Sequence, residues 1–288
     1  MRENEDQSSP NLGKLSLCGT PIGNLDDITL RVLKTLQECQ VIYAEDTRHS
    51  IKLLNHFGIS KPLYSYHEHN MERAGLEILD KIRAGDHVAL VTDAGMPGIS
   101  DPGEMLVKLC IEAGLPFEVV PGVTAFTTAL VGSGLDTSRF VFEGFLSRDK
   151  KQRRQLLEKI AKETRTLIFY ESPHRLKETL KQLISVFGER DAVVARELTK
   201  RYETFERGKL SDILAYYEAH EVKGEIVLLV RGYEMTAEDE IVYDLSESVA
   251  DHVNRLIKTG MDKKEAMKAV AIQRKMKKSE VYSALLED

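Results

Sequence analysis

The chain has 288 residues, of which 42% are hydrophobic and 30% are charged, and its formal net charge is −6. This length suits two medium domains, each able to bury its own core. The acidic balance excludes a wholly basic nucleic-acid coat protein but leaves room for a local basic patch. Three widely spaced cysteines favour a reducing, cytoplasmic compartment over a disulfide framework. The polar start of the chain and the lack of a long apolar window predict neither a signal peptide nor a transmembrane helix.

The first half of the chain alternates short apolar runs with amphipathic stretches, which predicts a mostly parallel α/β sheet. Strands are predicted at 15–18, 41–44, 63–67, 88–91 and 117–120. Helices are predicted at 28–36, 51–57, 71–83, 104–113 and 123–131. Asp26 or Asp27 is the expected N-terminal cap of the first helix, and Gly58 the expected end of the second.

A second α/β unit follows, with predicted strands at 140–142, 166–170, 192–195 and 225–230 and helices at 152–161, 175–187 and 210–220. A polar, acidic linker is expected at 233–244, and three short helices within 245–286. These patterns predict a disordered tail at 1–13 and an N-terminal α/β domain at 14–135. They also predict a second α/β domain at 136–232, followed by a linker and helical module at 233–288.

Three loops after predicted strands are rich in glycine and proline, namely 19–24, 93–103 and 121–125. Ligands of α/β sheets bind at the carboxyl ends of strands, so these loops are the first candidates for a binding site. They let a ligand approach the backbone closely. Neither the G-x-G-x-x-G fingerprint nor a Walker A sequence occurs, which favours a ligand without phosphates. The alternatives are a plain turn at 19–24 and an elaborate connection at 93–103.

Polar clusters follow three predicted strands, at 45–49, 170–175 and 196–200. Carboxylates beside Arg, Lys or His at a strand end suit substrate orientation or proton transfer. A helix cap is the alternative for the first cluster, and surface ion pairs for the other two. The sequence His67-Glu68-His69 lacks further ligands at a recognisable spacing, so we predict a polar cleft surface there and no metal site.

Basic residues crowd the start of the helix predicted at 152–161: Arg148, Lys150, Lys151, Arg153 and Arg154. Positive charge at a helix N-terminus opposes the macrodipole, which favours a role in phosphate contact over one in stability. A solvated helix face is the alternative. A second basic region lies in the predicted helices near the C-terminus and is typical of a small nucleic-acid-binding or partner-binding module.

Eight motifs occur in one order along the chain. They are TPIGNLDDIT (20–29), AEDTRHS (44–50), DAGMPGISDPG (93–103), PGVTA (121–125), EGFL (143–146), FYESPHR (169–175), ARELTK (195–200) and KGE (223–225). Together they resemble the bacterial ribosomal RNA small-subunit methyltransferase I family, which belongs to the tetrapyrrole (corrin/porphyrin) methylases. The pyrrole-binding sequences of the porphyrin enzymes are absent.

The resemblance implies a two-domain tetrapyrrole-methylase-like α/β fold with a small C-terminal helical tail, and a homodimer. It implies S-adenosylmethionine as cofactor, in a cleft between the domains. The implied reaction is methylation of the ribose 2′-oxygen of a decoding-centre cytidine in 16S rRNA, with the 30S subunit as partner. By motif alignment, the cofactor is expected to contact six residues, largely through the backbone: Ile22, Met96, Ile99, Thr124, Ala125 and Leu146.

A ribose hydroxyl is a poor nucleophile and needs a base nearby. The candidate bases are Glu45, Asp46, Glu171, Glu197 and Lys200, and we predict Asp46, Glu197 and Lys200 as the catalytic residues. Asp46 has two possible roles, since it either accepts the ribose proton or holds Arg48 against an RNA phosphate.

Arg48, Arg153 and Arg154 are the predicted RNA contacts. Two other functions remain open. One is methylation of a tetrapyrrole or other small molecule, against which the basic runs argue. The other is an inactive RNA-binding assembly factor, against which the intact cofactor-loop sequences argue.

Overall fold

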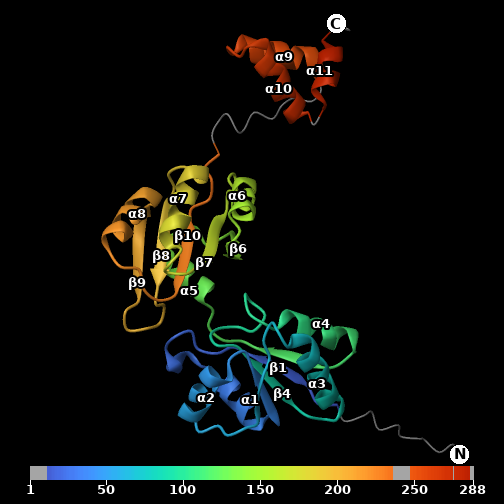
Figure 1. Ribbon diagram of the computed structural model, residues 1–288, viewed down its shortest axis with the longest axis vertical. Helices are drawn as coiled ribbons and strands as arrows, with labels where there is room; N and C mark the ends of the chain where they lie inside the picture. The colour runs from blue at the N-terminus through green and yellow to red at the C-terminus, as the bar shows by residue number, and fades with distance from the viewer. Residues whose placement is uncertain (1–11, 236–246, 275, 286–288) are drawn as a thin grey trace, which may run out of the picture. The chain divides into compact units, whose positions relative to one another are not determined.

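The computed structural model describes residues 12–235, 247–274 and 276–285. They belong to two compact units, Met1–Tyr233 and Glu234–Asp288 (Figure 1). The first unit contains two five-stranded sheets and the second contains helices only. Most of the predicted N-terminal tail and most of the predicted linker lie outside the described residues.

The first sheet confirms the predicted parallel arrangement. Its strands are β1 (Leu15–Cys18), β2 (Val41–Ala44), β3 (Leu63–Ser65), β4 (Val88–Val91) and β5 (Phe117–Val120). They lie in the order β3-β2-β4-β1-β5, and every pair is parallel. The central strands β1, β2 and β4 are buried along their whole length, which explains their unbroken apolar sequences. All the loops after these strands therefore lie at one edge of the sheet.

The helices of this half are α1 (Leu30–Glu38), α2 (Thr47–His56), α3 (Met71–Arg83), α4 (Glu104–Glu112) and α5 (Ala125–Ser133). Two predicted starts are wrong. Thr29, whose hydroxyl accepts a hydrogen bond from Val32 N, caps α1, while Asp26 and Asp27 lie in a 3-10 turn. Helix α2 begins four residues before the predicted start, because Asp46 caps it.

The second sheet is mixed rather than parallel. Its strands are β6 (Phe140–Phe145), β7 (Thr166–Glu171), β8 (Asp191–Arg196), β9 (Thr204–Lys209) and β10 (Ile226–Val230). In the order β6-β7-β10-β8-β9, only β6 and β7 are parallel. Strand β9 was not predicted, because its one large apolar residue, Phe205, gives this edge strand no apolar alternation.

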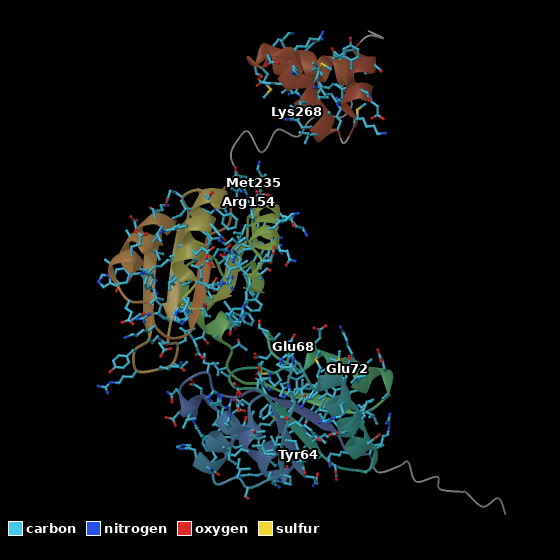
Figure 2. The ribbon with its side chains drawn as sticks, in the orientation of Figure 1. Tyr64, Glu68, Glu72, Arg154, Met235 and Lys268 are labelled. Atoms are coloured by element: carbon cyan, nitrogen blue, oxygen red, sulfur yellow. The ribbon has the colours of Figure 1, made fainter. Side chains whose placement is uncertain are left out.

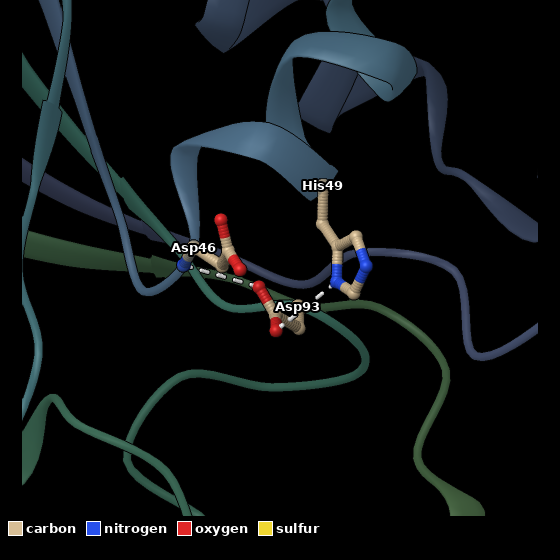
Figure 3. Close-up of side chains that lie close together, drawn as sticks. All are labelled: Asp46, His49 and Asp93. Atoms are coloured by element: carbon tan, nitrogen blue, oxygen red, sulfur yellow. Dashed lines mark hydrogen bonds and ion pairs between the residues drawn. The ribbon is translucent and has the colours of Figure 1, made fainter.

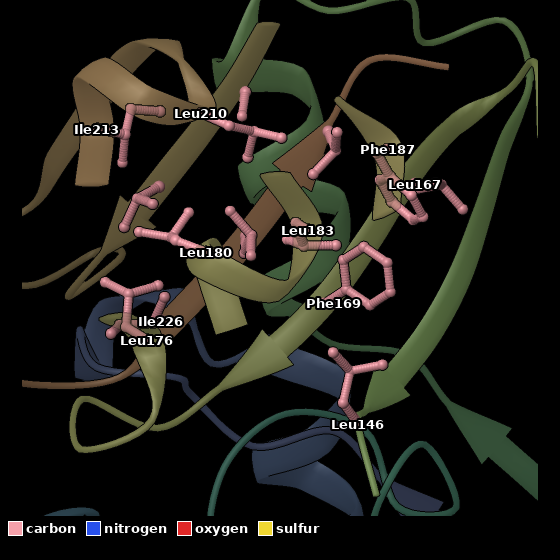
Figure 4. Packing of buried hydrophobic residues seen from close by; sticks show 14 of the residues in the cluster. Leu146, Leu167, Phe169, Leu176, Leu180, Leu183, Phe187, Leu210, Ile213 and Ile226 are labelled. Atoms are coloured by element: carbon pink, nitrogen blue, oxygen red, sulfur yellow. The ribbon is translucent and has the colours of Figure 1, made fainter. Parts of the chain in front are cut away.

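Helices α6 (Lys150–Lys159), α7 (Leu176–Phe187) and α8 (Leu210–Ala219) complete the first unit. Leu180 and Leu183 of α7 pack with Leu167 and Phe169 of β7 in the core of this half (Figure 4). Because β7 is anchored in this way, the loop that follows it is held in place.

The second unit consists of α9 (Val249–Lys258), α10 (Lys263–Gln273) and α11 (Lys278–Ala284), the three short helices that were predicted. Val253, Val270 and Val281 are fully buried in a core of their own. Ser248 caps α9, and Asp262 caps α10 with two backbone hydrogen bonds. In neither unit does a described helix have the length and apolar character needed to cross a membrane.

Candidate active site

A pocket of about 340 Å³, here called the first pocket, lies in the first unit where loops of both sheets meet. One side is formed by the loops after β1 and β4 and by the start of α5, and the other by the ends of β6, β7 and β8 and the start of β10. The lining residues are Ile22, Ala94, Gly95, Met96, Ile99, Ser100, Asp101, Thr124, Ala125, Phe145, Tyr170, Glu171, Ser172, Pro173, Leu198, Gly224, Glu225, Ile226 and Val227. All three predicted glycine- and proline-rich loops therefore contribute to, or adjoin, one pocket.

Two glycines bring the loops after β1 and β5 together behind this pocket. A Cβ on Gly19 would lie only 2.6 Å from Gly122 N and 2.5 Å from the sulfur of Met96. The Gly122 amide donates a hydrogen bond to that sulfur at 3.3 Å. Thr20 and Gly95 exchange backbone hydrogen bonds of 2.8 and 3.1 Å. The backbone around Met96 is thus fixed by contacts that tolerate no side chain at Gly19 or Gly122.

Strained backbone is confined to loops of the first pocket. Within the described ranges, the non-glycine residues with positive φ are Ser100, Glu197 and Thr199. Ser100 lines the pocket, and the other two flank its lining residue Leu198. Such conformations cost about 1–3 kcal/mol each and persist only where the surroundings impose them, typically at functional sites.

The structure brings five of the six predicted cofactor contacts together in the first pocket: Ile22, Met96, Ile99, Thr124 and Ala125. Leu146 is different, because it is only 2% exposed and packs in the core of the second sheet. Its carbonyl accepts a hydrogen bond from Arg175 at 2.9 Å. Leu146 therefore supports the β6 end of the pocket from behind.

Glu171 and Arg175 stabilise the same end of the pocket. The side chain of Glu171 is 1% exposed and accepts hydrogen bonds from the Thr179 hydroxyl at 2.6 Å and the Ser172 amide at 2.8 Å. Arg175 Nε lies 3.6 Å from its carboxylate. With its oxygens occupied in this way, Glu171 is a structural group rather than a free base.

A second pocket of about 490 Å³ adjoins the first and shares Ile22, Ala94 and Glu225 with it. It carries basic groups, which the first pocket lacks among its described lining residues. The lining residues of the second pocket are Thr20, Pro21, Ile22, Gly23, Leu25, His49, Ser50, Lys52, Leu53, Thr92, Asp93, Ala94, Lys200 and Glu225. The two adjoining pockets therefore differ in charge.

Asp46 caps α2 and binds Arg48. Its Oδ1 accepts a hydrogen bond from Arg48 N at 2.8 Å, and its oxygens bind the guanidinium at 2.6–3.2 Å. The side-chain hydrogen bond from Arg48 holds the pKa of Asp46 well below its usual range. Asp46 therefore stays ionised and is a weak proton acceptor. This geometry favours the second of its predicted roles, which is to hold Arg48.

Asp93 lies beside Asp46 and links it to His49 (Figure 3). Its Oδ1 accepts a hydrogen bond from Asp46 N at 3.2 Å, and its Oδ2 lies 3.3 Å from His49 Nδ1. Ligand atoms of Asp46, His49 and Asp93 lie within 4.8 Å of one another, a spacing that a metal ion would accept. Both Asp46 oxygens already bind Arg48, so the cluster serves as an ion-pair network.

Glu197, Lys200 and Glu225 form a second network. Lys200 Nζ lies 3.1 Å from Glu197 and 2.9 Å from Glu225. Burial alone would raise the pKa of Glu197, but hydrogen bonds from the Glu225 amide and Lys200 lower it below its ordinary value. Burial lowers the pKa of Lys200, but the two carboxylates outweigh it and raise the pKa. Lys200 is therefore a charged ammonium at neutral pH and cannot accept a proton.

The three predicted RNA contacts fall in different environments. Arg48 is exposed at the start of α2. Arg154, labelled in Figure 2, is 76% exposed on α6 and pairs with Glu158. The side chain of Arg153 is only 4% exposed and donates hydrogen bonds to Gln182, Ser147 O and Glu178. Arg153 joins α6 to α7 and does not present its charge to a partner.

Asp101, which lines the first pocket, was not among the predicted site residues. Its carboxyl is half-buried, and burial together with the nearby Glu45 and Asp93 raises its pKa to about 7. In the sequence, the second Asp of DAGMPGISDPG was the available signal. This signal is insufficient by itself, because no pattern in one sequence shows which loop carboxylate faces a pocket.

Comparison with known proteins agrees with this geometry. Residues 14–214 match the family model of the tetrapyrrole (corrin/porphyrin) methylases. A protein named ribosomal RNA small subunit methyltransferase I from Halalkalibacterium halodurans is 48% identical over 277 residues, or 96% of each chain. Its counterpart in Bacillus subtilis is 43% identical over 95% of this chain and 94% of its own. A Thermotoga maritima protein of the same name is 48% identical over 223 residues, which span 77% of this chain and 100% of that protein.

Solved structures share the fold of the first unit. Cobalt precorrin-4 methyltransferase is 24% identical with a TM-score of 0.57, covering 76% of this chain and 94% of its own. A uroporphyrin-III C-methyltransferase from Thermus thermophilus, solved with S-adenosyl homocysteine, is 20% identical with a TM-score of 0.55, covering 75% and 97%. The predicted fold is thereby confirmed. The chain belongs to the tetrapyrrole (corrin/porphyrin) methylases and, within them, to the ribosomal RNA small subunit methyltransferase I family.

Proposed function

We propose that this protein transfers a methyl group from S-adenosylmethionine to the ribose 2′-hydroxyl of a decoding-centre cytidine in 16S rRNA. The names of its relatives support methylation of small-subunit rRNA. The choice of the ribose 2′-hydroxyl and of a cytidine as the methylated position rests on the motif resemblance. The observation that carries the proposal is the difference in charge between the two adjoining pockets. The first has carboxylates and no basic group among its described lining residues, whereas the second has basic groups beside its carboxylates.

The first pocket fits a cationic ligand without phosphates. Among its described lining residues there is no Lys, Arg or His, while Asp101, Glu171 and Glu225 supply carboxylates. A phosphate-bearing cofactor would be repelled here, whereas a sulfonium with an adenosyl group suits a mainly apolar, acidic pocket. Ile22, Met96, Ile99, Thr124 and Ala125 would hold it, mostly through the backbone.

The bound cofactor supplies an activated methyl group, so the protein has to provide position and remove a proton. The tight contacts of Gly19 and Gly122 fix the loop that carries Met96. Glu171 and Arg175 fix the opposite end of the first pocket. These contacts hold each side of the pocket in a fixed geometry, and precise positioning of donor and acceptor is a main requirement of a displacement reaction.

The second pocket suits the ribose and phosphate of the substrate. It offers His49, Lys52 and Lys200. Glu197 and Glu225 hold Lys200, so we propose that Glu197 and Lys200 orient the nucleotide instead of removing its proton. Arg48 and Arg154 are the exposed groups that would contact RNA backbone, and Arg153 keeps α6 in place behind them.

The second unit would add RNA contacts. Its exposed lysines form no ion pair within the described part of the chain: Lys258, Lys263, Lys264, Lys268, Lys277 and Lys278. Lys268 is labelled in Figure 2. The Thermotoga maritima relative is matched over its whole length by 223 residues, fewer than the 288 of this chain, so we propose that the second unit is an addition to the catalytic body. A substrate of this kind places the protein in the cytoplasm.

The homodimer is also a proposal, and the surface that we assign to it lies on β5, β6 and α5. Strands β5 and β6 are edge strands of their sheets. They expose Phe117, Val119 and Phe140, and Val131 on α5 is 80% exposed. A second copy would cover these exposed apolar side chains.

Replacing Val131 by Glu should therefore convert a dimer into a monomer in sedimentation experiments. Ile111→Glu, a change of another exposed apolar residue on α4, is the matched control and should leave the dimer intact. A monomeric wild type, or an unchanged Val131→Glu dimer, would remove this surface from the account.

The proposed function is tested by offering labelled S-adenosylmethionine with 30S subunits, naked 16S rRNA or a porphyrinogen. We expect transfer to one of the RNA substrates and none to the porphyrinogen. Transfer to the porphyrinogen alone would contradict the proposal. Cofactor binding without any transfer would favour an inactive assembly factor.

A further inference from the structure

The first pocket contains three carboxylates, and two of them are already engaged. Glu171 accepts hydrogen bonds from Thr179 and Ser172 and lies beside Arg175. Glu225 is paired with Lys200 at 2.9 Å. For Asp101, by contrast, the described residues provide no hydrogen-bond donor and no cation. It is therefore the carboxylate of this pocket that is available to a ligand.

The loop that carries Asp101 is built to hold that position. Ser100, directly before it, has a φ of 64°. Gly103, two residues later, approaches Gly98 so closely that a Cβ would lie 2.8 Å from Gly98 N. A loop that keeps a serine in the left-handed region beside such a contact fixes the direction of the next side chain.

The groups that face Asp101 come from several elements. Glu45 follows β2 and Asp93 follows β4, and both are negative. Tyr170 at the end of β7 lies near enough to sense the charge of Asp101, and burial raises the pKa of this phenol to about 12, so it stays neutral. Asp93 is itself linked to His49 and Asp46. Two negative neighbours and partial burial make proton uptake by Asp101 favourable near neutral pH.

We propose that Asp101 is the general base that takes the proton of the substrate hydroxyl. This inference rests on the proposed function. As the 2′-oxygen bonds to the methyl carbon, the carbon–sulfur bond breaks and its electron pair stays on sulfur. The hydroxyl proton passes to an Oδ of Asp101 and from there to water. Asp46, Glu197 and Lys200 are unsuited to this step, since ion pairs keep the first two ionised and Lys200 protonated.

A base must be deprotonated to act, so the wild-type rate should rise with pH to a plateau, with its midpoint near the pKa of Asp101. Asp101→Asn should lower kcat by about 10²- to 10⁴-fold and abolish the rise, with S-adenosylmethionine affinity unchanged in calorimetry. Asp101→Glu keeps a carboxylate and should retain the rise at a reduced rate. Asp46→Asn is the matched control, and it should weaken RNA binding while keeping the pH profile.

Asp93→Asn tests the electrostatic origin of the effect. Loss of this negative neighbour should lower the pKa of Asp101, so the rise in rate should move to lower pH. The titration of the Asp101 carboxyl carbon, followed by NMR in the protein without ligands, should move in the same direction. This readout requires neither cofactor nor RNA.

An active wild type with an unchanged pH profile in Asp101→Asn would overturn the assignment and leave the proposed function intact. An Asp101→Asn variant that loses affinity for S-adenosylmethionine but not for S-adenosylhomocysteine would also overturn it, because the carboxylate would then bind the sulfonium of the cofactor. A wild type that methylates no RNA, with the carboxyl still titrating near neutrality, would instead contradict the proposed function.

Discussion

Gly95→Val should weaken S-adenosylmethionine binding by roughly 5- to 150-fold, or about 1–3 kcal/mol of binding free energy, because the new side chain would occupy space in the first pocket. Gly95 has a φ of +83° and lines the first pocket. A Cβ there would lie 3.6 Å from Ile22 Cγ2 and 3.8 Å from Val123 O, so the fold can accept it. The two branch methyl groups, however, would occupy space lined by Ile22. The measurement is calorimetric titration of the folded variant with the cofactor.

Gly114→Val provides the matched control. Gly114 has a φ of +64° at the end of α4, and no atom lies within 4 Å of the position of its Cβ. It therefore carries similar backbone strain outside the pocket. We expect a loss of stability in both variants and a loss of cofactor affinity in Gly95→Val alone. Wild-type affinity in folded Gly95→Val would rule out this loop as the cofactor site.

Arg153→Glu should lower the stability of the protein by about 3–5 kcal/mol, because it places a second carboxylate beside Glu178 in a nearly closed site. Arg153 Nη2 donates to Glu178 at 2.8 Å, and the guanidinium also binds Gln182 and Ser147 O. For a chain of this size the expected fall in Tm is on the order of 10 °C. Thermal unfolding followed by circular dichroism measures it.

Arg154→Glu is the contrasting change on the next residue. Arg154 is exposed and pairs only with Glu158, so stability should change by less than about 1 kcal/mol. If Arg154 contacts an RNA phosphate, the salt dependence of 30S binding should lose about one unit of slope. An Arg154→Glu variant that keeps the full slope would show that the exposed face of α6 is solvated and does not contact the RNA. Unchanged stability in Arg153→Glu would contradict its buried role.

The parallel first sheet was predictable because its strands are short apolar runs between amphipathic helices, and the periodicity of each is unambiguous. The arrangement of the second sheet was less predictable from the sequence. The antiparallel pairing of β10 with β7 and β8 depends on long-range contacts, and β9 lacks an apolar face. Helix starts depended on whether a polar residue caps locally, as Thr29 and Asp46 do.

The candidate site shows the same division. Glycine and proline mark backbone geometry directly in the sequence, so the loops of the first pocket were found. Charged residues carry no such mark, since carboxylates occur in helix caps, in ion pairs and in pockets alike. Arg153 was therefore predicted to contact RNA although it lies buried beside Glu178, and Asp101 was missed although it faces the pocket. Only the folded structure shows which charges are already paired.

The most direct test of the account follows the methyl group into the RNA. The protein is incubated with 30S subunits and S-adenosylmethionine that carries an isotopically labelled methyl group. One portion of the 16S rRNA is then digested to nucleosides and another to oligonucleotides, and both are analysed by mass spectrometry. We predict that the label appears in 2′-O-methylcytidine, on its ribose. We also predict that the labelled oligonucleotide comes from the decoding centre. Label on a base, on another nucleoside or in no RNA at all would contradict the central claim.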